Sequence, residues 1–184
     1  MKKFLFVSAT ALCCFFISCN NNNGGGLSPV AQKNLDANHG IQKAFETKDF
    51  SKIGDYIAED AVDHAGEKGD VKGLANMKAE FDKMAAMTEN DKMDIKKELA
   101  DDEYVMSWSR YSGKMKTDGM GMKAGDPFDM GAIEVTKFKD GKAIEHWSFM
   151  DMADMMKMMP PMPPGGAMPP MPMDSTKKDT TKKM

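Results

Sequence analysis

The sequence predicts an α+β domain with an antiparallel sheet. Helical patterns fill the first half of the domain, and alternating strand patterns fill the second half. Asp140-Gly141 is a two-residue hairpin signal, because both residue types tolerate positive φ. Helices and strands do not alternate as they do in parallel α/β folds, so the order favours helices packed on a hairpin-linked sheet.

Three helical segments are expected before the strands. Ser28 followed by Pro29 marks a helix start, because a hydroxyl can cap a helix and proline suits its first turn. This helix should continue to about Lys48, and a short second helix should begin at Asp49 or Ser51 and include Ile57. Residues 61–65 read as a short extended piece. The segment 72–87 is a clear amphipathic helix, with apolar residues spaced by three and four positions: Leu74, Met77, Phe81, Met84 and Met87.

Four strands are expected next, at 93–99, 103–115, 128–138 and 143–150. The glycine-rich stretch 119–125 is expected to be a loop. A last helix should run from Asp151 to about Met159, where Pro160 and Pro161 end it. The ordered domain is therefore predicted to span residues 29–159.

The N-terminus has the pattern of a secretory signal. Lys2 and Lys3 precede an apolar stretch of 14 residues, which is too short to cross a bilayer as a helix. The sequence FISC resembles the cleavage motif of bacterial lipoproteins, which predicts a signal peptide at 1–18, lipidation of Cys19 and a flexible tether over 19–28. The expected location is the bacterial cell envelope. The outer membrane is favoured, on its periplasmic side or at the surface, because no clear inner-membrane retention signal follows Cys19.

The C-terminal segment 160–184 is expected to be a disordered tail, rich in Met and Pro and then in Lys. Proline removes backbone donors and glycine adds chain entropy, so the stretch PPMPPGGAMPPMPM should not pack as a core element. Eleven of the 21 methionines lie from Met150 onward, and thioethers are ligands that suit Cu(I). A Cu(I)-binding role for this region therefore stands beside the simpler interpretation of a core-facing helix and a solvated tail.

Composition excludes several function classes. The net charge is −3, and no basic helix or aromatic platform suggests a nucleic-acid partner. The only cysteines beside Cys19 are Cys13 and Cys14, which leave with the signal, so disulfides, thiol catalysis and cysteine-based zinc sites are not expected. The histidines share no metal-binding spacing, so neither a metal nor another cofactor is predicted; they are His39, His64 and His146.

Alternation divides the last predicted strand into two faces. One face carries Ile144, His146, Ser148 and Met150, and the other carries Glu145, Trp147, Phe149 and Asp151. A carboxyl group beside aromatic rings has a raised pKa and can exchange protons near neutral pH. We therefore expect Asp151 to point inward beside Trp147 and Phe149, and we assign His39 and His146 structural roles.

The stretch DGK-x-IEHW-x-x-x-D resembles the end of SnoaL-like proteins of the nuclear-transport-factor-2-like superfamily. Three earlier segments agree with that family in order: GIQKAFETKDF, VDHAG and SRYSG. The resemblance covers about residues 33–158. It implies a cone-shaped fold, in which a curved antiparallel sheet is packed on N-terminal helices around an apolar pocket.

The resemblance also implies site residues. Asp151 matches an aspartate that acts as general acid/base in the cyclases, and His64 matches a histidine that would assist it. Arg110, Trp147, Phe149 and Trp108 are the candidate ligand-binding residues. The sequence departs from the family where a histidine after the central strand is replaced by SGKMKTDGMG and a Phe-Pro-Asp stretch by MTEND.

Each assignment has a structural alternative. Asp151 suits the N-cap of the last helix, His64 suits a hydrogen-bonded surface position, and Arg110 could pair with Glu145 across the sheet.

The function predicted from these features is a lipid-anchored domain that binds a small apolar or amphipathic molecule. Acid/base chemistry of the cyclase or isomerase type is the catalytic option, and whether the protein is an enzyme stays open. The alternatives are a non-catalytic binding or interaction module of the envelope, which could self-associate as a homodimer through its sheet, and the Met-rich Cu(I)-binding protein.

Overall fold

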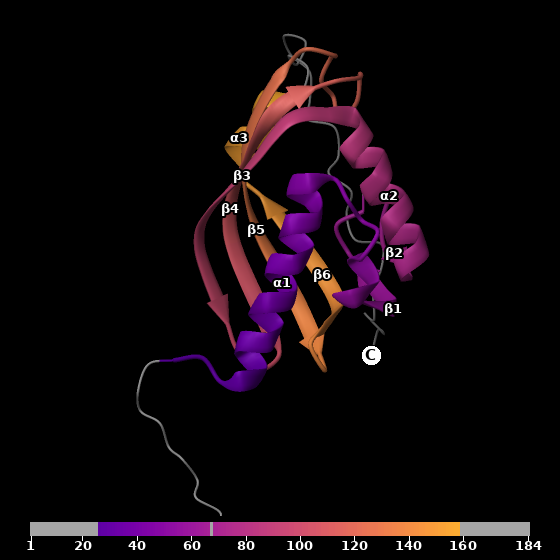
Figure 1. Cartoon of the computed structure of the whole chain (residues 1–184). Coiled ribbons are helices and arrows are strands. Elements are labelled where there is room, and N and C mark those ends of the chain that lie inside the picture. The colour runs from indigo at the N-terminus through magenta and orange to yellow at the C-terminus, as the bar shows by residue number, and fades with distance from the viewer. Residues whose placement is uncertain (1–25, 67, 159–184) are drawn as a thin grey trace, which may run out of the picture.

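The computed structural model describes residues 26–66 and 68–158. The predicted signal peptide, the predicted lipidation site Cys19, most of the predicted tether and the predicted tail lie outside these residues. Figure 1 shows the order of elements along the chain. The helices are α1 (Pro29–Thr47), the 3₁₀ turn η1 (Ile53–Asp55), α2 (Leu74–Met87) and α3 (Met152–Met158). The strands are β1 (Ile57–Asp63), β2 (Val71–Lys72), β3 (Thr88–Ala100), β4 (Tyr104–Met115), β5 (Pro127–Lys139) and β6 (Lys142–Met150).

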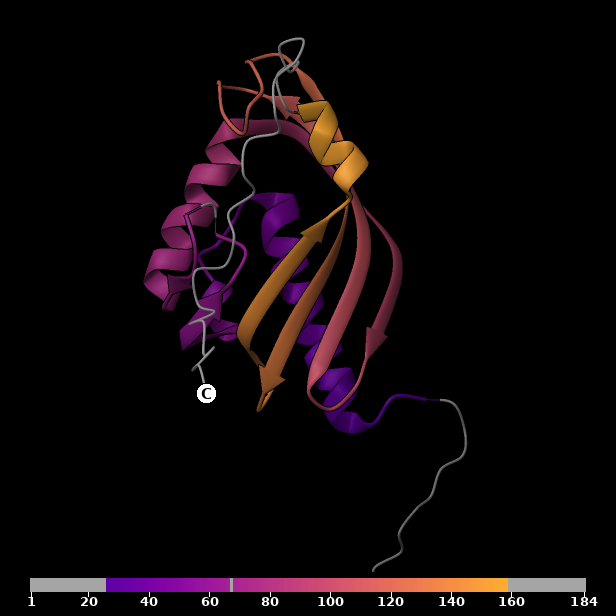
Figure 2. The ribbon, with the colours of Figure 1, turned by 180° about the vertical axis from the view of Figure 1, so that it is seen from behind.

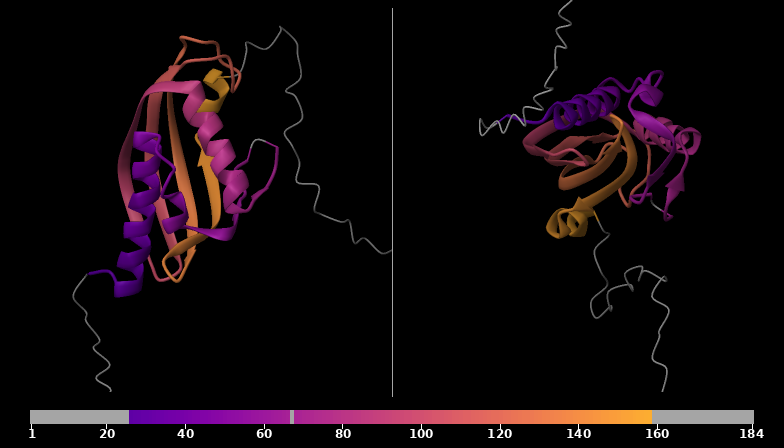
Figure 3. Two further views of the ribbon diagram at one scale, coloured as in Figure 1. Left: turned by 45° about the vertical axis from the view of Figure 1, so that its right-hand side comes forward. Right: turned by 90° about the horizontal axis from the view of Figure 1, so that it is seen from below.

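The α+β prediction and the cone-shaped architecture are confirmed. The described strands form a single six-stranded sheet in the order β2-β1-β6-β5-β4-β3. Figure 3 shows this sheet curling toward α1 and α2, which lie on its inner side. In Figure 2 the sheet stands in front of α1, and α3 lies on the outer side at one end.

The sequence suggested a wholly antiparallel sheet, but one of the strand pairs is parallel. β1 pairs with β6 in parallel, with Asp63 beside His146, and the other strand pairs are antiparallel. A parallel pair needs a long connection rather than a hairpin, and the chain between β1 and β6 contains α2 and three strands. Ile57 belongs to β1 and not to a short helix, because the helical element ends as one 3₁₀ turn at Asp55.

The predicted helix start and hairpin turn are both present. Ser28 Oγ accepts a hydrogen bond from the Ala31 amide at 3.0 Å, and Pro29 occupies the first turn of α1. Asp140 and Gly141 have φ of 55° and 81°, the left-handed values that a two-residue hairpin turn requires. Local side-chain chemistry therefore fixes where α1 begins and how β5 turns into β6.

The hydrophobic core lies between α1, α2 and the inner face of the sheet. The rings of Phe45, Phe50 and Phe81 meet with centroids 4.8–5.6 Å apart, two of the contacts edge-on. Such aromatic contacts each contribute about 1 kcal/mol beyond the area they bury. The cluster belongs to the core that both helices share with the sheet.

A polar cluster fastens α1 to the sheet. Glu98 Oε2 lies 2.6 Å from His39 Nε2, and its Oε1 accepts hydrogen bonds from Gln42 and Ser107 at 2.9 Å each. Burial alone would raise the pKa of Glu98, but these hydrogen bonds outweigh it and hold the pKa below its ordinary value. The carboxylate therefore connects a helix to two strands with both of its oxygens hydrogen-bonded.

Candidate functional site

A cavity of about 370 Å³ lies between α1, α2 and the inner face of the sheet. Its walls are mostly apolar, and eight methionines contribute to them: Met77, Met84, Met93, Met115, Met120, Met122, Met130 and Met150. Methionine is unbranched and polarizable, and it adapts to ligands of irregular shape. The volume suits a small organic molecule.

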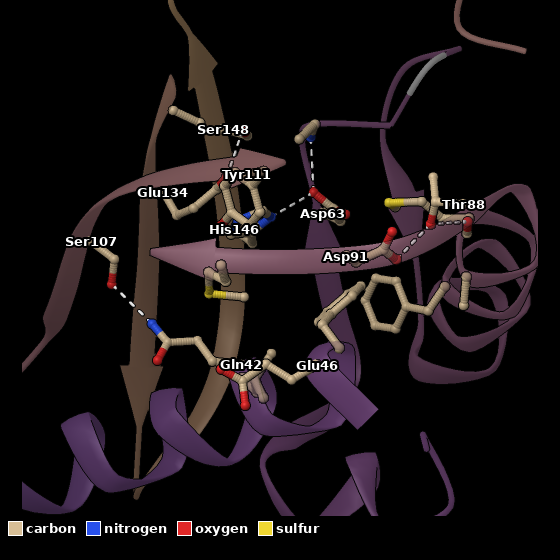
Figure 4. Close-up of a pocket in the computed structure, with 18 of the residues that line it drawn as sticks. Gln42, Glu46, Asp63, Thr88, Asp91, Ser107, Tyr111, Glu134, His146 and Ser148 are labelled. Atoms are coloured by element: carbon tan, nitrogen blue, oxygen red, sulfur yellow. Dashed lines mark hydrogen bonds and ion pairs between the residues drawn. The ribbon is translucent and has the colours of Figure 1, made fainter. Parts of the chain in front are cut away.

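A chain of hydrogen-bonded polar groups enters the cavity from β1, β5 and β6 (Figure 4). His146 Nδ1 lies 2.9 Å from Asp63 Oδ1, and His146 Nε2 lies 2.9 Å from Glu134 Oε2. The other oxygen of Glu134 accepts a hydrogen bond from Ser148 Oγ at 3.1 Å. We call these four residues the inner polar cluster.

The histidine of this cluster is a cation at neutral pH. Burial alone would lower the pKa of His146, but its hydrogen bonds to Asp63 and Glu134 outweigh burial and raise the pKa to about 9. Burial would likewise raise the pKa of Asp63, and the hydrogen bond and charge of His146 lower it instead. The cluster therefore places one imidazolium between the carboxyl groups of Asp63 and Glu134.

Tyr111 adds a phenol donor to the cavity wall. Burial, and then the negative charge of Glu134, raise the pKa of the Tyr111 phenol well above its ordinary value. Tyr111 lines the same cavity as His146 and Glu134 (Figure 4). The site therefore combines a phenol that keeps its proton with a carboxylate that can accept one.

A second polar group lies at another part of the cavity wall. Lys48 has φ of 55° at the end of α1, and its Nζ lies 2.7 Å from Asp91 Oδ2. The same Nζ donates to the carbonyl of Ala85 at 2.9 Å, and Asp91 also accepts from Thr88 Oγ1 at 2.7 Å. Lys48 thus neutralises Asp91 and satisfies a carbonyl in the last turn of α2, which is a structural role.

The prediction that the face of β6 with Trp147 and Phe149 points into the cavity is wrong. The strand pairs Lys137 with Glu145 but Phe138 with Ala143, so Ile144 is an extra residue in a β-bulge. His146, Ser148 and Met150 line the cavity. Because alternate residues point to opposite faces, Trp147 and Phe149 lie on the outer face instead.

Asp151 does not line the cavity, and its predicted inward position is wrong. It is exposed, and its Oδ1 accepts a hydrogen bond from the Ala153 amide at 2.8 Å and a longer one from the Asp154 amide. The side chain is used as the N-cap of α3, so the structural alternative holds.

His64 and Arg110 also lie away from the cavity wall. His64 stacks on Trp147 with ring centroids 4.9 Å apart, and its Nδ1 lies 3.0 Å from Asp70 Oδ1. Its neighbour Asp63 points inward, because the two residues are adjacent at the end of one strand.

Arg110 does not pair with Glu145. Its Nε lies 2.6 Å from Asp129 Oδ1, and its Nη1 lies 3.2 Å from Asp154 Oδ2. These ion pairs fasten α3 to β4 and β5. Trp108 is 57% exposed and Phe149 is 60% exposed on the outer face, so neither is placed to contact a ligand in the cavity.

The residues of the inner polar cluster were not singled out by sequence reasoning. His146 was present in the IEHW motif but was assigned a structural role, and Glu134 and Tyr111 sit in unremarkable alternating strands. A signal was available in part, since VDH and IEHW each join an acidic residue to a histidine. Their pairing depends on the parallel contact of β1 with β6, which the hairpin pattern does not reveal.

Among the described residues, no group of three or more His, Cys, Asp or Glu side chains is arranged to hold a metal ion. None of the helices described is long and apolar enough to cross a membrane.

Comparison with known proteins gives one family and many similar folds. The family model described as SnoaL-like polyketide cyclase matches residues 36–159. No curated protein matches the sequence significantly.

Solved structures similar to this chain cover its domain and nearly all of their own length. IdmH of Streptomyces antibioticus is 22% identical, with a TM-score of 0.58 over 68% of this chain and 96% of that one. A SnoaL-like polyketide cyclase from Agrobacterium tumefaciens is 14% identical, with a TM-score of 0.60 over 67% and 95%. An LEH-like epoxide hydrolase from M. tuberculosis is 15% identical, with a TM-score of 0.59 over 71% and 92%. At these identities the likeness establishes the fold.

Proposed function

Because the chain belongs to the SnoaL-like polyketide cyclase family over residues 36–159, we propose that it binds a small, mostly apolar molecule in the inner cavity. We propose further that it catalyses proton transfer from that molecule. The observation that carries this proposal is the inner polar cluster. Asp63, His146 and Glu134 form an unbroken hydrogen-bonded chain inside an otherwise apolar cavity. Ionised groups are costly to bury, and their presence in such a place is typical of functional sites.

Glu134 is the proposed proton acceptor. Each of its oxygens already accepts one hydrogen bond, and a carboxylate oxygen has a further lone pair that can face a ligand. His146 acts as a positioning residue, since its Nε2 is hydrogen-bonded to Glu134 and its Nδ1 to Asp63, so both of its nitrogens are occupied. Tyr111 donates a hydrogen bond to a ligand oxygen. This set suits removal of a proton from a carbon next to a carbonyl group, a step of cyclase- and isomerase-type reactions.

Deuterium exchange tests the proton transfer. 2-Tetralone, a small apolar ketone with acidic C–H bonds, is incubated with the protein in deuterated buffer, and exchange is followed by NMR. Glu134→Gln should slow the protein-dependent exchange by about 100-fold, because a positioned base contributes on that order. Ser148→Ala is the matched control, since it removes a hydrogen bond from the same carboxylate and keeps the base. Equal exchange by wild type and Glu134→Gln would refute the role of Glu134.

Binding without catalysis is the second candidate. It is favoured by one observation, which is that the inner polar cluster satisfies its own hydrogen bonds and leaves His146 no free nitrogen. The neutral fluorophore N-phenyl-1-naphthylamine probes the cavity directly. Binding that Ala85→Phe abolishes, with no exchange of any ketone tested, would support a binding module. Both candidates predict that the fluorophore binds, and only the first predicts exchange.

The proposed location is the bacterial cell envelope, with a lipid on Cys19. This part of the proposal rests on the sequence of residues 1–28, with the FISC motif at its centre. Metabolic labelling with radioactive palmitate in the producing bacterium tests it. The wild-type chain should incorporate label and fractionate with membranes, and Cys19→Ser should do neither. Labelling of Cys19→Ser at the wild-type level would refute the anchor.

A further inference from the structure

The outer side of the sheet carries a group of exposed apolar side chains that the cavity does not use. Figure 2 views this side, where α3 at one end is the only helix lying over the strands as described. We call the group the outer apolar face, and it consists of the exposed Leu99, Met106, Trp108, Ile133 and Phe149 together with the half-buried Val135 and Trp147. Leu99 and Phe149 are each 60% exposed and Trp108 is 57% exposed. Large side chains exposed together at this level mark an interaction surface.

Strand register makes this surface continuous. Met106 on β4 stands between Leu99 on β3 and Val135 on β5. One step along the same face, Ile133 on β5 stands between Trp108 on β4 and Phe149 on β6. Directly opposed residues have Cβ atoms about 5 Å apart, so the two rows form one patch across four strands.

The C-terminal sequence begins beside this surface. α3 is fixed to the sheet because Asp154 accepts a hydrogen bond from the Gly131 amide at 3.0 Å and pairs with Arg110. The helix starts three residues after Phe149 and is seven residues long, which is about 10 Å. Met158, the last described residue, therefore lies about 10 Å from the edge of the outer apolar face.

The composition of residues 159–173 matches that surface. The sequence MPPMPPGGAMPPMPM contains five methionines and seven prolines and no charged residue. Proline-rich segments are largely preformed in an extended helix, and they bind to exposed aromatic side chains with a small loss of entropy. Methionine sulfur also makes favourable contacts with aromatic rings. The outer apolar face supplies three such rings, those of Trp108, Trp147 and Phe149.

The segment is long enough to cross the face. Residues 160–173 would extend about 43 Å at 3.1 Å per residue in that conformation. The 13 residues of β5 also span about 43 Å, at 3.3 Å per residue. Attachment to α3 gives the segment an effective concentration on the order of 1 mM at the face, well above the concentration of a second molecule in ordinary solution.

We propose that the outer apolar face is a docking surface for residues 160–173 of the same chain. The segment lies outside the described residues, and its sequence, length and starting point carry the proposal. Docking would shield apolar side chains that the sheet leaves open. This inference is independent of the proposed chemistry in the cavity, which lies on the other side of the sheet.

Tryptophan quenching tests the proposal in the full chain. Trp147→Phe leaves Trp108 as the single reporter, and quenching of its fluorescence by acrylamide is measured. The test variant replaces the apolar tail residues Met162, Met168, Met171 and Met173 by Ser. The matched control replaces the charged tail residues Lys177, Lys178, Lys182 and Lys183 by Gln. The Met→Ser variant should raise the quenching constant about two-fold and shift the emission to longer wavelength. The reason is that loss of the docked tail would expose the Trp108 indole to water, as it is exposed in the described domain.

A photo-crosslinker gives a second readout. Benzoylphenylalanine at position 133 should form an intrachain bond to a peptide within 160–173 at any protein concentration. Quenching that is equal in the Met→Ser variant, the control and the wild type would overturn the proposal. Quenching and crosslinks that appear only as concentration rises, together with a dimer in sedimentation, would also overturn it and would assign the face to a second copy of the chain.

Discussion

The charge on His146 makes a quantitative prediction about stability and pH. The pKa of His146 rises to about 9 in the folded protein, and an ordinary histidine has a pKa near 6.5. A raised pKa means that the folded state holds the proton more tightly than the unfolded chain does. The resulting stabilisation is fully present below about pH 6.5 and is lost as the pH rises through 9. The difference in pKa corresponds to about 3 kcal/mol of unfolding free energy.

The measurement compares wild type with His146→Gln, which cannot hold this proton. Urea unfolding at pH 6, 7, 8, 9 and 10 gives the free energy of unfolding of each protein. The unfolding free energy of the wild type minus that of His146→Gln should fall by about 3 kcal/mol from pH 6 to pH 10. The other titrating groups contribute equally to both proteins and cancel in this difference. Asp63→Asn should reduce the fall, because it removes one of the two carboxylates that face the ring. Ser148→Ala should keep it, because both carboxylates stay beside the ring.

A constant difference between wild type and His146→Gln across this range would refute the reasoning. It would mean that the folded protein does not hold a proton on His146, and that Glu134 lacks the cationic partner on which the proposed chemistry depends.

Three further predictions concern the fold. Glu98→Ala should lower the free energy of unfolding by about 2–3 kcal/mol in urea, because it leaves donors of α1 and β4 without their shared acceptor; Asp94→Ala, on the exposed part of the same strand, should cost far less. Asp151→Ala should cost about 1 kcal/mol through the lost N-cap, whereas Asp151→Asn should be nearly neutral and neither should weaken fluorophore binding. Gly141→Ala should lower the stability measured by thermal unfolding by about 1–2 kcal/mol, because φ of 81° is unfavourable for a residue with a Cβ; an unchanged melting temperature would contradict this account of the turn.

Elements with local signals could be predicted from the sequence. Ser28-Pro29 located the start of α1, and Asp140-Gly141 located the turn between the last two strands. The apolar spacing of residues 72–87 located α2 within two residues of its start. In each case the determining interactions lie within a few residues of one another, so the pattern carries them.

The site could not be predicted to the same degree, because it depends on a bulge and on a distant pairing. Alternation correctly placed His146 and Trp147 on opposite faces, but the extra residue at Ile144 decides which of the two faces points inward. Strict alternation cannot locate such an insertion. The choice between catalyst and cap for Asp151 depended on where the carboxylate points, and only the three-dimensional path of the chain decides that.

The parallel contact between β1 and β6 also determines when the cluster can assemble. Asp63 and His146 are 83 residues apart in the chain, and the carbonyl of His146 accepts the amide of His64 at 2.8 Å in the same strand pair. Contacts between residues distant in the sequence form late and slow folding, because closing the intervening chain into a loop costs conformational entropy. The inner polar cluster is thus completed only after the last strand has been synthesised, and a chain that ends before β6 would lack His146 and Ser148.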